Sequence, residues 1–377
     1  MRNKPSNKEK EIKILHIIQS INLYGGTPRK ILWLARESKY KHFIFYTGNK
    51  DKEINYTRSK RKIAENNIVF IDPYRKQLLI KQLLYINKYI KNENIDIIQG
   101  NFNYDYILCG LLKLLNPKIK FIATFVGSES PKSKWRNVFI DYFLKLSDYN
   151  IFISSYVRES KQNVYKTLFK KENRIIYNGA LPVYGILKEN SSYNSKIILT
   201  TTSGLNPYKN LSVLIDAIAL VKNKFTDIFL NIVGDGSLRV ELENRVNELG
   251  LTEHIKFWGY RNDIGFFLSN TNIYVHPADK EGFGIAVIEA MVAKLPVLLS
   301  NAGALPELIV NNESGLLANP YDHIDWAKKI IYLIENKSER IRLGFNAYNR
   351  VNEHFKMERY VFEYDEIYQN LNKSKLL

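Results

Sequence analysis

The residues best suited to chemistry lie in a predicted loop and helix at positions 276–300. The loop ends in Glu281-Gly282-Phe283-Gly284, and a run of helix-forming residues follows. Two glycines allow the backbone to approach a ligand closely. The free N–H groups and the dipole at the start of a helix favour a phosphate or a sugar oxygen. The segment therefore predicts a binding site for one of these groups.

Two glutamates frame this predicted site. Glu281 lies in the loop, and Glu289 follows eight residues later, about a turn into the helix. A carboxylate accepts hydrogen bonds from neighbouring hydroxyls, so one glutamate can hold a sugar and the other a ribose. The alternatives are an acid stabilised by the helix dipole at Glu281 and a solvated surface acid at Glu289; the apolar neighbours of Glu289 disfavour the second. His276 fits a structural role and a site role equally well.

The elements that must position these residues alternate between short apolar strands and helical patterns. This alternation predicts an α/β fold with parallel sheets, in the form of two Rossmann-like doubly wound domains facing a central cleft. Ligands in such sheets bind beyond the carboxyl ends of the strands. The strands are predicted at residues 13–19, 42–47, 68–72, 95–99, 120–125, 148–153, 174–177, 197–202, 228–234, 255–258, 273–276, 296–300 and 314–317.

The domain boundaries follow from a polar stretch with Pro, Gly and a Ser/Asn cluster in the middle of the chain. We expect an N-terminal domain at residues 1–183, a linker at 184–196 and a C-terminal domain at 197–355. The aromatic-rich helix at about 356–377 is expected to pack back on the N-terminal domain.

Several further motifs, in a fixed order along the chain, carry a family resemblance. Together with Glu281-x7-Glu289, the sequence resembles family 4 (group 1) glycosyltransferases of the GT-B type. The motifs are Gly25-Gly26-Thr27, Tyr177-Asn178-Gly179-Ala180, Ile232-Val233-Gly234-Asp235-Gly236, Asn301-Ala302-Gly303-Ala304-Leu305-Pro306-Glu307 and Glu313-Ser314-Gly315-Leu316-Leu317.

The resemblance implies a nucleotide-diphosphate sugar donor held mostly by the C-terminal domain. Glu289 would bind the ribose, and Glu281 with the backbone of Gly282, Phe283 and Gly284 would meet the transferred sugar. Lys209 would contact the diphosphate, where a cation stabilises the developing charge. The remaining donor-site residues expected from the resemblance are Gly204, Asn210, Gly234 and Arg261.

The sequence departs from the family pattern at two positions. Gly204 stands where the family has an Arg five residues before the Lys, so a second diphosphate cation would come from elsewhere, with Arg261 as the candidate. Val126 stands where many members carry a His, so no role of that His transfers. We expect Gly25, Gly26, Gly127 and Ser128 to form a loop region for the acceptor or a phosphate, with Glu129 as a further candidate.

The expected reaction follows from the family and from what the sequence lacks. There is no Asp-x-Asp sequence and no His/carboxylate cluster at ligand spacing, so we expect no metal and no cofactor, with Lys209 and helix N-termini in the place of Mg²⁺. The family implies retention of configuration at the anomeric carbon. A front-face route, in which the leaving phosphate assists deprotonation of the acceptor hydroxyl, is the working hypothesis.

Positive charge is concentrated in one half of the chain. Residues 1–190 hold 35 Lys and Arg against 16 Asp and Glu, whereas the remainder holds 20 against 22. An anionic partner for the N-terminal half explains this asymmetry better than a compositional bias does. Cations beside a predicted helix at 77–90 and around Trp135 favour an anionic membrane surface. We expect a cytoplasmic enzyme, peripheral at the inner face of the membrane, because no signal peptide and no membrane span are evident.

The substrate and some alternative functions stay open at this point. The donor is expected to be a UDP-sugar, or else a GDP-sugar, carrying a hexose or N-acetylhexosamine, and the acceptor a glycan or lipid-linked saccharide. The Lys/Asn/Ile-rich composition is typical of an AT-rich bacterial genome, and so of capsule, O-antigen or other surface-polysaccharide synthesis. The alternatives are a nucleotide-sugar epimerase and, on charge alone, a nucleic-acid-binding protein, although no recognition motif predicts nucleic acid as a partner.

Overall fold

The computed structural model describes residues 11–18, 26–47, 69–71, 79–128, 133–165, 167–183 and 196–373. The chain divides into two compact units. Unit 1 comprises Met1–Ile153, Arg158–Ile176 and Glu358–Leu377, and unit 2 comprises Ser154–Val157 and Tyr177–Met357. Among the described residues, no helix has both the length and the hydropathy of a membrane-spanning segment.

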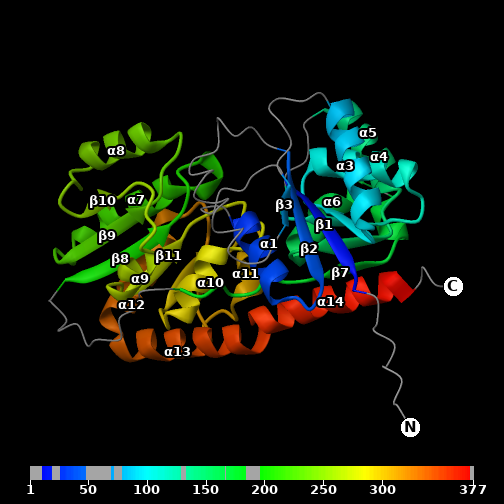
Figure 1. Ribbon diagram of the computed structural model, residues 1–377. Coiled ribbons are helices and arrows are strands. Elements are labelled where there is room, and N and C mark those ends of the chain that lie inside the picture. Colours follow the sequence, from blue (N-terminus) through cyan, green and yellow to red (C-terminus); the bar gives the residue numbers. More distant parts are fainter. Residues whose placement is uncertain are drawn as a thin grey trace, which may run out of the picture. The chain divides into compact units, whose positions relative to one another are not determined.

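Unit 1 is built on a seven-stranded parallel sheet in the order β3-β2-β1-β4-β5-β6-β7 (Figure 1). Its strands are β1 (Lys13–Ile18), β2 (Lys41–Tyr46), β3 (Val69–Ile71), β4 (Ile97–Gly100), β5 (Lys120–Phe125), β6 (Tyr149–Phe152) and β7 (Asn173–Ile175). Its helices are α1 (Gly26–Glu37), α3 (Leu79–Glu93), α4 (Asn103–Leu115), α5 (Lys134–Leu144), the 3-10 turn η2 (Leu168–Lys170) and α14 (Met357–Lys373). Helix α6 (Ser155–Gln162) begins in unit 2 and continues into unit 1.

The two faces of the unit 1 sheet carry different helices because successive side chains of a strand point to opposite faces. Phe43 and Phe45 of β2 contact Tyr89 and Tyr85 of α3, and α4 packs beside α3 and α5 on this face. The opposite face is covered in part by α14, where Tyr368 donates a hydrogen bond to the buried Gln99 of β4 at 2.8 Å.

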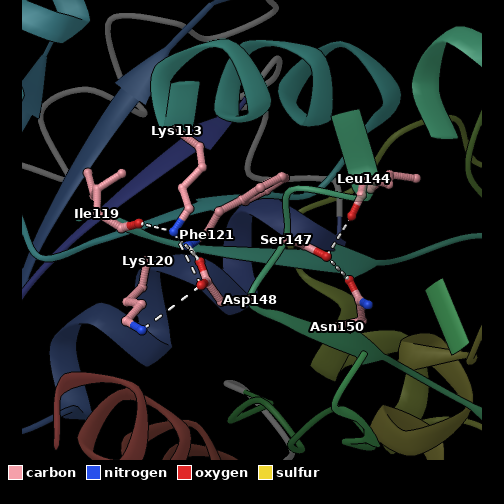
Figure 2. A network of polar contacts seen from close by, with 8 residues as sticks. All are labelled: Lys113, Ile119, Lys120, Phe121, Leu144, Ser147, Asp148 and Asn150. Carbon is pink, nitrogen blue, oxygen red and sulfur yellow. Dashed lines mark hydrogen bonds and ion pairs between the residues drawn. The ribbon is translucent and has the colours of Figure 1, made fainter. Parts of the chain in front are cut away.

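The ends of α4 and α5 are fixed to the sheet by a polar network (Figure 2). Lys113 of α4 donates to the Ile119 carbonyl at 2.6 Å and pairs with Asp148 at 2.9 Å. Asp148 also accepts the Phe121 N–H at 2.8 Å. Ser147, between α5 and β6, has its hydroxyl 2.8 Å from the Leu144 carbonyl and 2.9 Å from the side-chain oxygen of Asn150 in β6. These bonds hold both helices firmly against strands β5 and β6.

Unit 2 is built on a six-stranded parallel sheet in the order β10-β9-β8-β11-β12-β13. Its strands are β8 (Ile197–Thr202), β9 (Ile228–Val233), β10 (Ile255–Phe257), β11 (Ile273–His276), β12 (Val297–Ser300) and β13 (Leu316–Ala318). Its helices are the 3-10 turn η3 (Pro207–Lys209), α7 (Leu211–Lys222), α8 (Arg239–Glu248), α9 (Ile264–Ser269), α10 (Ile285–Val292), α11 (Leu305–Leu308), α12 (His323–Glu335) and α13 (Lys337–His354).

An apolar core lies between one face of this sheet and helices α7, α8 and α12. It includes Leu199 of β8, Ile232 of β9, Ile218 of α7 and the fully buried Trp326 of α12. Alternate residues of β8 and β11 point to the other face, where the Thr202 hydroxyl and the Tyr274 hydroxyl lie 2.8 Å apart. The core thus fixes the strands from which the site loops leave.

Unit 2 begins earlier in the chain than the predicted domain of residues 197–355. Tyr177 packs on Phe283 and Phe355, and the Ala180 N–H donates to the Phe355 carbonyl at 2.7 Å. These contacts tie residues 177–180 to unit 2. Of the predicted linker 184–196, only Lys196 lies within the described residues.

Candidate active site

The candidate site lies where the order of strands in unit 2 reverses direction. Strands β8 and β11 are parallel neighbours, and the chain proceeds from β8 to β9 on one side and from β11 to β12 on the other. In a doubly wound sheet, loops leaving two such strands separate at their carboxyl ends and leave room for a ligand. Lys209 follows β8, and Glu281 follows β11.

These two loops bring together an ion pair and a histidine. Lys209 Nζ lies 2.6 Å from Glu281 Oε2, and the side chains of both residues are 16% exposed. His276 Nε2 lies 3.1 Å from the same Glu281 oxygen, and His276 is buried. The carboxylate of Glu281 therefore accepts hydrogen bonds from two partners that the sequence places 72 and 5 residues away.

The protonation states of the cluster follow from its burial and charges. Burial on its own would raise the pKa of Glu281, but the Lys209 ammonium and the His276 hydrogen bond outweigh burial and hold that pKa well below its usual range. Burial lowers the pKa of His276, and the charge of Lys209 lowers it further against the opposing effect of Glu281. His276 is thus neutral at pH 7, and its Nε2 carries the proton because its partner there is a carboxylate.

Backbone contacts hold the Glu281 loop in place. The Asp279 N–H donates to the Tyr208 carbonyl at 3.1 Å, which joins the loops after β8 and β11. Gly303, after β12, has φ +61°, and a Cβ there would lie 2.6 Å from the Glu281 nitrogen. The next residue, Ala304, donates its N–H to the Glu281 carbonyl at 2.9 Å. The sequence places Gly303 in a turn that resembles the family motif, but it does not predict the contact of Gly303 with Glu281.

Helix α10 begins directly after this loop. Gly284 precedes its first residue with φ +104°, a left-handed conformation that L side chains rarely adopt. Glu289 lies inside the helix and is buried, which excludes the solvated surface role. The Phe283 side chain is also buried and packs on Tyr177 and Phe355, so only its backbone is available to a ligand.

A second glycine turn lies beside the loop after β8. Gly234 directly follows β9 with φ +140°, and a Cβ there would lie 1.9 Å from the Ser203 carbonyl oxygen. The Leu205 N–H donates to the Asp235 carbonyl, which joins the two loops. At Gly204, by contrast, a Cβ would meet at close range only the side chain of Asn206, at 3.0 Å. The turn thus requires glycine at 234 but leaves space at 204.

Family models match this chain over most of its length. A model described as "Glycosyl transferases group 1" matches residues 186–350, and one described as "Glycosyltransferase Family 4" matches residues 33–180. The chain belongs to glycosyltransferase family 4.

Curated relatives of this family 4 glycosyltransferase span much of its chain. An uncharacterized glycosyltransferase of Methanocaldococcus jannaschii is 27% identical over 92% of this chain and 95% of its own length. N-acetyl-alpha-D-glucosaminyl L-malate synthase of Bacillus anthracis is 24% identical over 74% of this chain and 76% of its own. The capsular polysaccharide biosynthesis glycosyltransferase CapM of Staphylococcus aureus is 29% identical over 44% of each chain.

Solved structures share the architecture. A glycosyltransferase from Rickettsia africae superposes with a TM-score of 0.82 at 20% identity, over 97% of this chain and 100% of that one. Anabaena HepE in complex with UDP-glucose superposes with a TM-score of 0.81 at 19% identity, over 97% and 100%. The two doubly wound units are the GT-B fold, which confirms the fold predicted from the sequence.

Two residues predicted for the donor site of the family 4 glycosyltransferase have other partners in this structure. The Asn210 side chain donates to the Pro320 carbonyl at 2.6 Å, and Asn210 itself adopts a left-handed conformation before α7. Arg261 forms two bonds with Asp263, at 2.9 and 2.7 Å. Both side chains thus pair within unit 2 in this structure.

The residues predicted for the acceptor or phosphate region lie in unit 1 or outside the described residues. Gly26 begins α1, and Gly25 lies outside the described residues, as does Glu129. Gly127 follows β5, with open space where a Cβ would stand. The Ser128 carbonyl accepts a hydrogen bond from Lys161 at 3.2 Å. Within the described part of the chain, no group of three or more His, Cys, Asp or Glu residues is placed to hold a metal ion.

Proposed function

We propose that this chain is a retaining glycosyltransferase for surface-polysaccharide synthesis that moves a hexose or N-acetylhexosamine from a UDP-sugar to a glycan or lipid-linked saccharide. The observation that carries the proposal is the ion pair between Lys209, which follows β8, and Glu281, which follows β11 and lies shortly before the start of α10. A GDP-sugar is the alternative donor. The UDP-glucose bound by Anabaena HepE and the capsular assignment of CapM support the choice of donor and pathway.

The proposed roles follow from the chemistry of each group. Lys209 leaves its position against Glu281 to meet the donor diphosphate, where its charge stabilises the leaving group. The free N–H groups at the start of α10 support the same negative charge. Glu281 then accepts hydrogen bonds from sugar hydroxyls, and Glu289 binds the ribose.

The proposed reaction balances without a metal or a cofactor. The bond between the anomeric carbon and the phosphate oxygen breaks, and a bond from the acceptor oxygen forms on the same face of the sugar. The acceptor proton moves to the departing phosphate oxygen. Lys209 supplies the positive charge that a divalent cation supplies in other transferases.

Ligand-induced thermal stabilisation tests the donor site. UDP, GDP and ADP are compared with and without Mg²⁺, because a ligand that binds the folded state raises Tm by mass action. We expect one nucleotide to raise Tm independently of Mg²⁺ in the wild type, and the shift to vanish in Glu289→Ala. Glu253→Ala, at an exposed glutamate elsewhere in unit 2, is the control and keeps the shift.

Product analysis tests the reaction itself. The anomeric proton coupling of the product, measured by NMR, reports whether configuration is retained. An inverted product refutes the retaining route, and an isomerised nucleotide sugar formed without any acceptor identifies an epimerase instead. If a nucleotide still raises the Tm of Glu289→Ala as it does in the wild type, Glu289 does not bind the ribose.

A further inference from the structure

Two sequence motifs that have no role in the proposed function meet at one carboxylate. Glu307 lies in α11 and ends the motif at 301–307, and Tyr177 begins the motif at 177–180. The Tyr177 hydroxyl donates a hydrogen bond to Glu307 Oε2 at 3.0 Å, across 130 positions of the chain. Both residues belong to unit 2. The two motifs therefore form one tertiary feature of that unit.

The Glu307 carboxylate binds the first turn of α6. Its Oε2 accepts the Ser155 N–H and its Oε1 accepts the Tyr156 N–H, each at 2.8 Å. The buried Ser154 directly precedes the helix, and its hydroxyl accepts the Val157 N–H at 3.1 Å, as an N-cap residue does. The first N–H groups of a helix have no partner within the helix. Here two side chains satisfy three of them, and they fix the place within unit 2 where α6 begins.

The Ser154 hydroxyl also reaches the donor loop (residues 281–284). It donates a hydrogen bond to the Gly282 carbonyl at 2.8 Å. This carbonyl and the Phe283 N–H belong to one trans peptide unit, so the two groups point in opposite directions. The bond from Ser154 therefore directs the Phe283 N–H away from α6. The backbone of this loop is the part that is expected to meet the transferred sugar.

The side chain of Phe283 is held by the same carboxylate through a group of packed rings. The ring centroids of Tyr177 and Phe355 lie 6.0 and 5.8 Å from that of Phe283, which is buried. Arg350 donates to the Glu307 carbonyl at 3.2 Å, and its guanidinium lies 5.9 Å from the centre of the Phe355 ring. Glu307 thus supports the donor loop twice, at its backbone through α6 and at its aromatic ring through Tyr177.

We propose that Glu307 and Ser154 are positioning residues of the donor site, which fix the peptide between Gly282 and Phe283 so that the Phe283 N–H faces the sugar half of the donor. The proposal rests on the proposed function, because it takes the donor loop as the place of the transferred sugar. Without the carboxylate, two N–H groups of α6 lose their acceptor, and Ser154 is no longer held beside the loop. The peptide then adopts other orientations, which weakens binding of the sugar but not of the nucleotide.

Hydrogen exchange of the full chain without ligand tests the positioning by itself. Wild type is compared with Ser154→Ala and with Glu307→Gln, which offers one oxygen to two N–H groups. We expect the amides of residues 282–285 to exchange at least about fivefold faster in both variants, because the loop opens more easily. Ile218→Val, in the fully buried core at α7, is the control for general destabilisation: it lowers Tm but leaves exchange of the donor loop unchanged.

Calorimetry tests the donor role, with UDP, UDP-glucose, GDP and GDP-glucose as probes. For the nucleotide that binds, we expect both variants to lose about tenfold in affinity for the sugar conjugate, the equivalent of one hydrogen bond, and less than about threefold for the diphosphate alone. Glu253→Gln, at an exposed glutamate of unit 2, binds both as the wild type does. Tyr177→Phe keeps the ring but loses the bond to Glu307, so it should show a smaller loss of the same kind, and it replaces Ser154→Ala if that variant does not fold.

Three results would overturn the proposal. Unchanged exchange of the donor loop in folded Glu307→Gln and Ser154→Ala, with nucleotide binding intact in the wild type, refutes the positioning alone. Equal losses for the diphosphate and its sugar conjugate, or the same selective loss in Ile218→Val, show that these residues act only on the stability of unit 2. A wild type that binds none of the four probes refutes the proposed function and with it the donor role of Glu307 and Ser154.

Discussion

Replacing Lys209 with methionine removes the positive charge that holds the ionised Glu281 in its partly buried position. The two side chains lie 2.6 Å apart and are 16% exposed. At an effective dielectric constant near 20, this separation corresponds to about 6 kcal/mol of attraction. Desolvation offsets roughly half of that energy, so losing one partner is expected to lower the free energy of unfolding of unit 2 by about 3 kcal/mol at pH 7.

The pH dependence of this loss has a definite sign. In the wild type the pKa of Glu281 lies below its usual range, so its ionised form stabilises the fold above the unfolded pKa of about 4.3, and this stability is lost as pH falls below that value. In Lys209→Met, burial raises the pKa of Glu281, and protonation relieves the unpaired charge as pH falls. The difference between variant and wild type should therefore shrink between pH 7 and pH 4.

The assay is denaturant unfolding followed by tryptophan fluorescence in a Trp33→Phe/Trp135→Phe background, which leaves only the two tryptophans of unit 2. Glu281→Gln and the double variant complete a mutant cycle. We expect a coupling of about 1.5–3 kcal/mol between the two residues. Lys280→Met, at the exposed neighbouring lysine, is the control and should change stability by less than about 0.5 kcal/mol.

Two results would refute this reasoning. In the first, Lys209→Met and Glu281→Gln each lower the free energy of unfolding by less than about 0.5 kcal/mol, and the double variant shows the sum of the two effects. The second is a loss of stability in Lys209→Met that stays constant from pH 7 to pH 4. Either result would show that the ion pair contributes no net stability in the absence of a ligand.

Three further predictions follow from particular contacts. Gly234→Ala should destabilise unit 2 by more than about 2 kcal/mol, because its Cβ would overlap the Ser203 carbonyl, whereas Gly204→Ala should be nearly neutral in denaturant unfolding. Gly204→Arg should fold and raise nucleoside-diphosphate affinity several-fold by calorimetry, because it restores the cation that the family pattern contains. Tyr368→Phe should cost about 1–3 kcal/mol in unit 1 unfolding, because the buried Gln99 oxygen loses its donor.

Each of these predictions has a contradicting outcome. Equal stability of the two alanine variants would mean that the turn at Gly234 relaxes freely. Unchanged nucleotide affinity in Gly204→Arg, with Gly204→Lys as a second cation to compare, would mean that position 204 does not face the diphosphate. A neutral Tyr368→Phe would mean that Gln99 finds another donor, which hydrogen exchange in α14 would reveal as unchanged protection.

The predicted strands match the structure best where an apolar run is bounded by turn residues. The bounds predicted for β5, β8 and β11 are those observed. The helix expected at about 356–377 corresponds to α14, which runs from Met357 to Lys373 and is separated from α13 at Phe355 and Lys356. Helix α5 was not predicted, because its exposed apolar residues Trp135, Val138, Phe139 and Tyr142 give no clear separation between a buried and a solvated face.

For the site, the sequence patterns name candidate residues but do not predict the contacts between them. The pairing of Lys209 with Glu281 depends on strands β8 and β11 being neighbours, and the sequence does not state the strand order. The close approach of Gly303 to the Glu281 backbone arises from the same order, since β12 lies next to β11. The hydrogen bond from the Asn210 amide to the Pro320 carbonyl joins residues 110 positions apart, so it depends on the tertiary structure.

Unit 1 is completed by the last helix of the chain, and this affects how the protein folds during synthesis. Residues of α14 cover Gln99 and His42, yet they are made after all of unit 2. At a synthesis rate of about 5–20 residues per second, the sheet of unit 1 waits roughly 10–40 s for this helix. During that interval unit 2 can finish folding while one face of the earlier sheet stays uncovered. Newly made chains should therefore need chaperone protection at that face, and a chain ended before α14 should aggregate although unit 2 is intact.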